Sequence, residues 1–215
     1  MSSETGRWAR RIVMLGTPVL FAIVSLMHPV PKTARIMENL QLGHGVWLAV
    51  HVAQLFLIGL LGVTLWFLLA GLRGRAATVG RLAIVPFLVF YTGFDSLSGV
   101  GTGLLAQKAE AIAGPERVIA FSLVQQFWEA LLDPGSPTLY MYLLGNVSWL
   151  VSVFASAAAF RGAGASQSSI VLLISAGILF GIDHPFPTGT AGMLCLLFAI
   201  GFLDREGFVK RSGTD

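Results

Sequence analysis

The sequence predicts an all-α polytopic membrane protein, a six-transmembrane-helix bundle that forms a single integral membrane domain over residues 1–215. Hydrophobic residues make up 55% of the chain and charged residues 12%, which is about half the charged fraction of a typical soluble domain. Several apolar runs also reach the roughly 20 residues that a helix needs to cross a bilayer. Because these runs use most of the length, a separate soluble domain is not expected.

Short segments rich in proline, glycine or charge separate the apolar runs and set the limits of the predicted spans. Pro29 and Pro31 end the first run because proline disrupts the helix that precedes it. The predicted spans cover about residues 12–30, 44–72, 82–106, 138–160, 168–182 and 190–203.

Residues 116–133, in the longest connection, predict an additional helix that does not cross the membrane. Apolar side chains such as Ile119 and Leu123 recur at helical spacing, and polar side chains such as Gln126 and Glu129 fall between them. We expect an amphipathic helix that lies in the membrane interface between the third and fourth spans.

The distribution of basic residues predicts the orientation of the chain. With six spans the two termini share one side, and 10 of the 14 lysines and arginines fall in the segments on that side. The positive-inside rule therefore predicts a multi-pass protein of the cell membrane with both termini in the cytoplasm. The basic residues flank apolar runs, so their expected partner is the lipid bilayer and not nucleic acid.

All four histidines and the two aspartates that fall at membrane depth lie in the predicted outer half of the bundle. His44 and His51 are seven residues apart, so they share a helix face about 10 Å apart along its axis. Polar groups inside a membrane are costly, and such a cluster is by default a candidate functional site. Its members are His28, His44, His51, Asp95, Asp183 and His184.

Imidazole and carboxylate groups together suit zinc or another first-row metal. The leading hypothesis is a metal-dependent, membrane-embedded enzyme that acts at the outer leaflet on a lipid or a small molecule. Asp95 and Asp183 are the candidate catalytic residues, as metal ligands, as partners that orient a histidine, or as a base. The candidate metal ligands are His51, His44, His184 and His28. The candidate binding residues are Gln54, Tyr91, Ser98 and Glu129.

Three alternative functions remain open at the level of sequence. Histidines on two helices could hold a b-type haem. Asp95 and His51 could form a protonation pair in a proton-coupled binding or transport protein. The polar cluster could also hold the helices together in a structural or accessory membrane subunit.

Aromatic and glycine residues complete the predictions for this half of the bundle. Trp47, Trp128 and Trp149 lie near the proposed outer boundary, which predicts residues of an interfacial aromatic belt. Gly99, Gly101 and Gly103, in the third span, would let another helix approach closely or let the backbone line a cavity.

Overall fold

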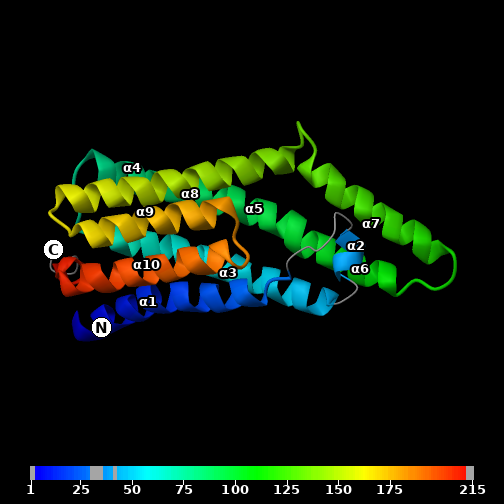
Figure 1. Cartoon of the computed structure of the whole chain (residues 1–215), viewed down its shortest axis with the longest axis horizontal. Helices are drawn as coiled ribbons and strands as arrows, with labels where there is room; N and C mark the ends of the chain where they lie inside the picture. The colour runs from blue at the N-terminus through cyan, green and yellow to red at the C-terminus, as the bar shows by residue number, and fades with distance from the viewer. Residues whose placement is uncertain (1–2, 30–35, 41–42, 212–215) are drawn as a thin grey trace.

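The computed structural model describes residues 3–29, 36–40 and 43–211, without the side chains of residues 3, 38, 39, 44, 210 and 211. All regular elements in these ranges are helices (Figure 1). Those of the first half are α1 (Ser3–Met27), α2 (Ile36–Leu40), α3 (His44–Leu69), α4 (Arg75–Pro86), η1 (Phe87–Tyr91), α5 (Thr92–Asp95), η2 (Ser96–Gly101) and α6 (Thr102–Glu110). Those of the second half are α7 (Glu116–Leu132), α8 (Pro137–Gly162), α9 (Gln167–Ile182), α10 (Thr188–Arg205) and α11 (Phe208–Arg211).

Five segments of the described chain are long and apolar enough to cross a membrane: Glu4–Met27, Gly45–Leu69, Arg75–Glu110, Pro137–Gly162 and Thr188–Arg205. The fifth predicted span corresponds to α9, which is apolar but has only 16 residues, or about 24 Å of helix. The all-helical, membrane-type architecture is therefore confirmed, with five segments that meet the length of a span and a shorter sixth.

The long helices form a closed ring in which each packs against its neighbours. Helix α1 lies between α3 and α10, α9 lies between α10 and α8, and α8 packs against α4 and η1. Helix α3 contacts α4 and closes the ring. Aromatic side chains fill the centre, where the rings of Trp149 and Phe180 lie 4.9 Å apart and both residues are fully buried.

The third span is one continuous helical segment, Arg75–Glu110, that contains two π-helical stretches, η1 and η2. The four residues of α5 lie between these stretches and end at Asp95. At 36 residues the segment is about 54 Å long, well beyond the roughly 30 Å of a hydrocarbon core. In a membrane, a segment of this length would have to tilt strongly or extend beyond the hydrocarbon core.

Helix α7 occupies nearly the range predicted for an amphipathic helix. It folds back along α6, with α2 beside it, at the end of the bundle opposite the chain termini (Figure 1). Val124 and Leu131 are buried, whereas Ile119 and Leu123 of the predicted apolar face are 63% and 59% exposed. The helix is present, and its position relative to a membrane remains a prediction.

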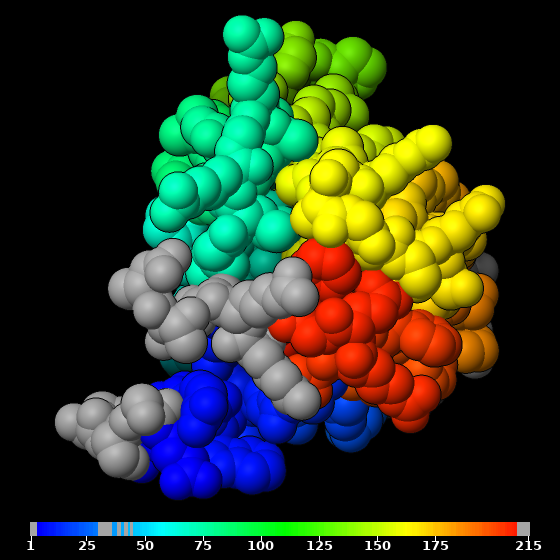
Figure 2. Space-filling view, turned by 90° about the vertical axis from the view of Figure 1, so that its left-hand side faces the viewer, coloured from blue at the N-terminus to red at the C-terminus, as the bar shows by residue number. Residues whose placement is uncertain are grey.

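The bundle has two ends with different contents. One end, which we call the terminal end, holds the start of α1, the start of α4, the α8–α9 turn, the end of α10 and α11 (Figure 2). The end of α1, the start of α3 and the α9–α10 turn meet at the other, which we call the distal end (Figure 1). Both histidines of the α1 and α9–α10 connections, His28 and His184, belong to the distal end.

The tryptophans correct one prediction. Trp47 is 2% exposed and Trp149 is fully buried, so neither belongs to an exposed aromatic belt. Each indole N–H donates a hydrogen bond inside the bundle, from Trp47 to the Gly99 carbonyl at 2.8 Å and from Trp149 to the Gly177 carbonyl at 3.0 Å. Sequence position placed these residues near a boundary, but it could not show that they face inward.

Candidate metal centre

Three histidines from separate parts of the chain converge at the distal end. His28 follows the last turn of α1, His51 lies two turns into α3, and His184 lies in the turn between α9 and α10. Their ligand nitrogens all lie within 4.8 Å of one another. His28 and His51 are 6% and 3% exposed, and His184 is partly buried. We refer to these residues as the histidine triad.

Backbone carbonyls determine which nitrogens of the triad point at each other. The Nδ1 of His28 lies 3.0 Å from the Pro29 carbonyl, and the Nδ1 of His51 lies 2.8 Å from the Trp47 carbonyl. Since a carbonyl oxygen only accepts, each Nδ1 carries the hydrogen and each Nε2 of a neutral ring is a bare acceptor. These two Nε2 atoms face each other at 3.2 Å.

Burial keeps the members of the triad that lie outside the spans in the neutral form. Burial lowers the pKa of His28, and the hydrogen bond to the Pro29 carbonyl offsets this only in part. Burial also lowers the pKa of His184, with a further contribution from the neighbouring His28 and His51. Neutral imidazole is the form that binds a metal.

The α9–α10 turn is held against α1, which brings His184 to the triad. The Phe186 N–H donates to the Ser25 carbonyl at 3.2 Å, one turn before His28. Within the turn the Gly189 N–H donates to the Pro185 carbonyl at 2.8 Å, and a side chain at Gly189 would overlap the backbone of His184. As a result the rings of His28 and His184 lie 5.0 Å apart, edge to face.

A glycine of the third span makes room for His51. A side chain at Gly99 would overlap the His51 ring, so the close approach of η2 to α3 requires a residue without a Cβ at this position. The Gly99 carbonyl accepts the Trp47 indole N–H, while the Trp47 carbonyl accepts the His51 Nδ1–H. Gly99 and Trp47 therefore fix the position and tautomer of His51 together.

Asp95 is a buried carboxyl group beside the triad. Its Oδ1 lies 3.9 Å from the His51 Nε2, the residue is 1% exposed, and its Oδ2 has no hydrogen-bond partner. The π-helical stretches on both sides of α5 change the register of the helix around it. Such stretches are rare and frequently occur at functional sites, where they turn a side chain toward a different face.

Among the described residues, most polar atoms that are buried without a hydrogen-bond partner lie in the half of the bundle next to the distal end. Native proteins satisfy nearly all such groups, so a concentration of exceptions indicates a site whose natural occupant is an ion, water or polar ligand. Eight of ten belong to this half, and Arg10 Nε and Thr64 Oγ1 are the other two. The eight are Ser25 Oγ, Gln54 Nε2 and Oε1, Asp95 Oδ2, Thr102 Oγ1, Asn146 Oδ1, His184 Nε2 and Thr190 Oγ1.

Two further predicted residues lie next to the triad. The buried Tyr91 ring lies 6.1 Å from that of His184. The Asp183 Oδ1 lies 3.9 Å from the His184 Nδ1, but its side chain is 62% exposed. Burial raises the pKa of Asp183 despite a hydrogen bond to the backbone of His184.

The remaining predicted residues differ in what the structure shows of them. Ser98 is buried and donates to the Phe94 carbonyl at 2.9 Å, so its hydroxyl is used within its own helix. Glu129 is exposed on α7, where it accepts a hydrogen bond from Gln125 at 2.7 Å. Gln54 is 1% exposed and has both amide atoms unpartnered. The side chain of His44, at the start of α3, lies outside the described residues.

Trp47 is the functional residue that sequence reasoning misassigned. Its ring lies 4.4 Å from that of His51 and 5.6 Å from that of His28, so it forms one wall of the centre. Its position four residues before His51 was the available signal, because residues at this spacing share a helix face.

Comparisons with protein families, with curated proteins and with solved structures find no match to this chain. The functional assignment therefore rests on the geometry of the distal end.

Proposed function

We propose that this protein is an integral membrane metalloenzyme in which His28, His51 and His184 bind one first-row metal ion, zinc being the best suited. The observation that carries the proposal is the convergence of three imidazoles, two buried and one partly buried, whose ligand nitrogens lie within 4.8 Å of one another. The reaction class we assign is metal-assisted hydrolysis of a lipid or small molecule that reaches the distal end.

The separation of His28 and His51 supports a shared ion. Two ligands of a tetrahedral metal with bonds of 2.0–2.1 Å lie about 3.3 Å apart. The two Nε2 atoms lie 3.2 Å apart. His184 is farther away within the 4.8 Å limit, so its ring must turn toward this pair to complete a three-histidine site.

The tautomers of the same pair support a cation between them. Two bare nitrogen lone pairs at 3.2 Å repel each other unless a proton or a metal ion lies between them. A proton would leave a positive charge in a buried site, which the lowered pKa of His28 disfavours. A metal ion also supplies a partner for the unpaired Nε2 of His184.

Three protein ligands leave a coordination position open, and this favours catalysis over a purely structural role. Structural zinc sites use four protein ligands, whereas catalytic sites keep one position for water. When bound, zinc would lower the pKa of such a water to about 7. Asp95, 3.9 Å from the His51 Nε2, is placed to accept its proton or to hold it in position. The unpaired amide of Gln54 offers a donor and an acceptor to the substrate.

The same distances favour a single metal ion over a b-type haem. Two imidazoles on opposite faces of a haem iron hold their nitrogens about 4 Å apart, twice a metal–nitrogen bond of about 2 Å. The His28 and His51 nitrogens are closer than this and lie on the same side of any shared ion.

The proposal includes an orientation in the cell membrane. Six spans, with α9 as the short one, put both termini on the cytoplasmic side, where the positive-inside rule favours the basic residues of the terminal end. The histidine triad then lies near the outer leaflet. A tag at either terminus should stay shielded in intact cells, and labelling of either tag from outside would contradict this orientation.

The test of the metal centre is elemental analysis of the protein purified without a histidine tag, together with its absorption spectrum. We expect about one first-row metal ion per chain and no Soret band. His51→Ala should lower the affinity for the metal more than about 100-fold, because removing even a group that only supports a ligand costs 10–100-fold. Gln126→Ala, on the exposed side of α7, is the matched control and should retain the metal. A metal-free wild type that binds no added zinc would overturn the assignment.

A further inference from the structure

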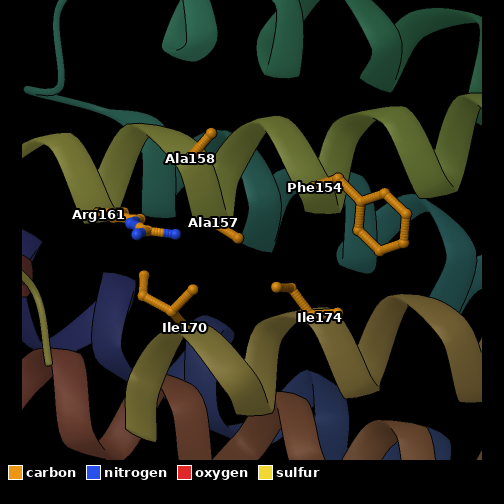
Figure 3. Close-up of a pocket in the computed structure, with 6 residues that line it drawn as sticks. All are labelled: Phe154, Ala157, Ala158, Arg161, Ile170 and Ile174. Atoms are coloured by element: carbon orange, nitrogen blue, oxygen red, sulfur yellow. The ribbon is translucent and has the colours of Figure 1, made fainter. Parts of the chain in front are cut away.

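A groove near the terminal end lies between α8 and α9, on the outer surface of the bundle (Figure 3). Its position is independent of the histidine triad, which lies at the opposite end. The lining residues are Phe154, Ala157, Ala158, Arg161, Ile170 and Ile174.

The shape and chemistry of the groove fit a single hydrocarbon chain. Five of the six lining residues are apolar, and the two alanines create the hollow because they leave space that larger residues fill elsewhere on α8. Phe154 is 40% exposed and Ile174 is 37% exposed, so the walls are open to the surroundings of the bundle. In a membrane-spanning protein those surroundings are lipid acyl chains.

A charged group stands at one end of this apolar groove. Arg161 lies in the last turn of α8, and its guanidinium extends into the gap between the two helices (Figure 3). Arginine presents a fork of N–H donors that matches the geometry of a phosphate. Its place at the end of a span is the depth at which lipid headgroups lie.

We propose that this groove binds an anionic phospholipid, with one acyl chain between α8 and α9 and the headgroup phosphate on Arg161. Charge complementarity selects the lipid, because most basic residues of the chain belong to the terminal end, and a negatively charged leaflet attracts basic segments beside a span. A protein segment in the groove would bring an apolar helix face without satisfying the guanidinium.

The experiment is native mass spectrometry of the full-length protein, released from nanodiscs that contain equal amounts of phosphatidylglycerol and phosphatidylcholine. We expect preferential retention of one phosphatidylglycerol per chain. Arg161→Gln should lower its retention about tenfold or more, the factor expected for the loss of a direct hydrogen bond to a charged phosphate group. The matched control is Arg75→Gln, which removes an exposed arginine of the same end outside the groove and should leave retention unchanged.

A second variant separates the groove from general surface electrostatics. Ala158→Phe fills the groove from its exposed side and keeps every charge, so it should lower retention at least as much as Arg161→Gln. Unchanged retention in Ala158→Phe, an equal loss in Arg75→Gln, or equal retention of both lipids would each overturn the proposal. So would an unassigned protein mass that remains bound in place of lipid.

Discussion

The two ends of the bundle differ in how fully their polar side chains are paired, since eight of the ten unpartnered buried polar atoms of the described residues belong to the distal half. At the terminal end charged side chains find partners: Arg11 binds both carboxylate oxygens of Asp204 at 2.8–2.9 Å, and Arg81 donates to the Leu69 and Leu72 carbonyls. At the distal end Asp95, Gln54 and His184 keep buried atoms without partners.

This contrast separates charged side chains that stabilise the bundle through hydrogen bonds from polar side chains that are free to bind an ion, a water or a ligand. Arg81 satisfies carbonyls at the end of α3 that have no partner within the helix, which is a structural task. Leaving a buried polar atom unpaired costs about 1–3 kcal/mol, so a water, an ion or a ligand is the expected partner of such atoms. Four variants test this contrast.

Gly99→Val should have the largest effect, because the new side chain would overlap the His51 ring and push η2 away from α3. We expect loss of the bound metal and a destabilisation of about 1–3 kcal/mol, typical of an overpacked core. Metal analysis and thermal unfolding in detergent measure both. Gly101→Ala is the control, since a Cβ there meets its nearest atoms at 3.4 and 3.9 Å and should be tolerated. A Gly99→Val protein with normal metal content would show that the triad is not built as described.

Asp95→Asn preserves shape but removes a group that can accept or donate a proton beside the His51 Nε2. We expect a 10–100-fold loss of metal affinity or of hydrolytic activity in a folded protein, the usual cost of losing a group that supports a metal ligand. Zinc titration of the two purified proteins makes the comparison. Asp183→Asn, whose side chain is 62% exposed, should have a much smaller effect. Equal zinc affinities in wild type and Asp95→Asn, with equal activity, would remove Asp95 from the centre.

Arg11→Gln tests the terminal end. The Arg11–Asp204 pair joins α1 to α10 with both side chains only partly exposed, at 31% and 24%. We expect a loss of about 0.2–1 kcal/mol in stability, as for other ion pairs near a surface, and no change in metal content. Thermal unfolding of Arg11→Gln, Asp204→Asn and the double variant isolates the pairwise energy. A change in zinc affinity in any of the three would contradict the separation of the two ends.

Glu206 should give the smallest effect, and one that depends on pH. Burial alone would raise its pKa, but hydrogen bonds from the Ser166 hydroxyl and N–H and from Ser169 outweigh burial and lower it. A lowered carboxylate pKa contributes stability above the ordinary value of 4.5, and this contribution disappears as pH falls through the lowered pKa. Glu206→Gln should therefore unfold at a slightly lower temperature than wild type at pH 7. The two melting temperatures should converge in acid, and a difference that grows there would contradict the sign of this shift.

Much of the fold followed from sequence because span prediction depends on composition and length. The runs around residues 44–72 and 138–160 became α3 and α8 nearly as predicted. The third span extends beyond the predicted 82–106 because Arg75–Pro86 and Thr102–Glu110 continue the same helical segment at both ends. The two π-helical stretches were beyond prediction, since they depend on packing against α3 and α8 and not on local residue preference.

The sequence predicted the residue types of the candidate site and their depth in the bundle, but not which of these residues come together. Depth placed His28, His51, His184 and Asp95 in one half of the bundle, and the structure brings these four together. Depth could not separate them from Glu129, which lies exposed on α7, or from Ser98, whose hydroxyl bonds within its own helix. Whether a residue joins the site depends on the direction in which its side chain points from the helix. The direction that faces the site depends in turn on which helices pack together.

Sequence alone therefore determined the class of the protein and the level at which its costly polar residues lie, because hydrophobic length and the penalty for burying polar groups are properties of local composition. Which of those residues come into contact depends on how the helices pack. The His28–His51 contact requires that α1 pack against α3, and that Gly99 let the third span approach the His51 ring. Such contacts depend on the fit between helix surfaces that are far apart in the chain. Local sequence patterns therefore cannot predict them.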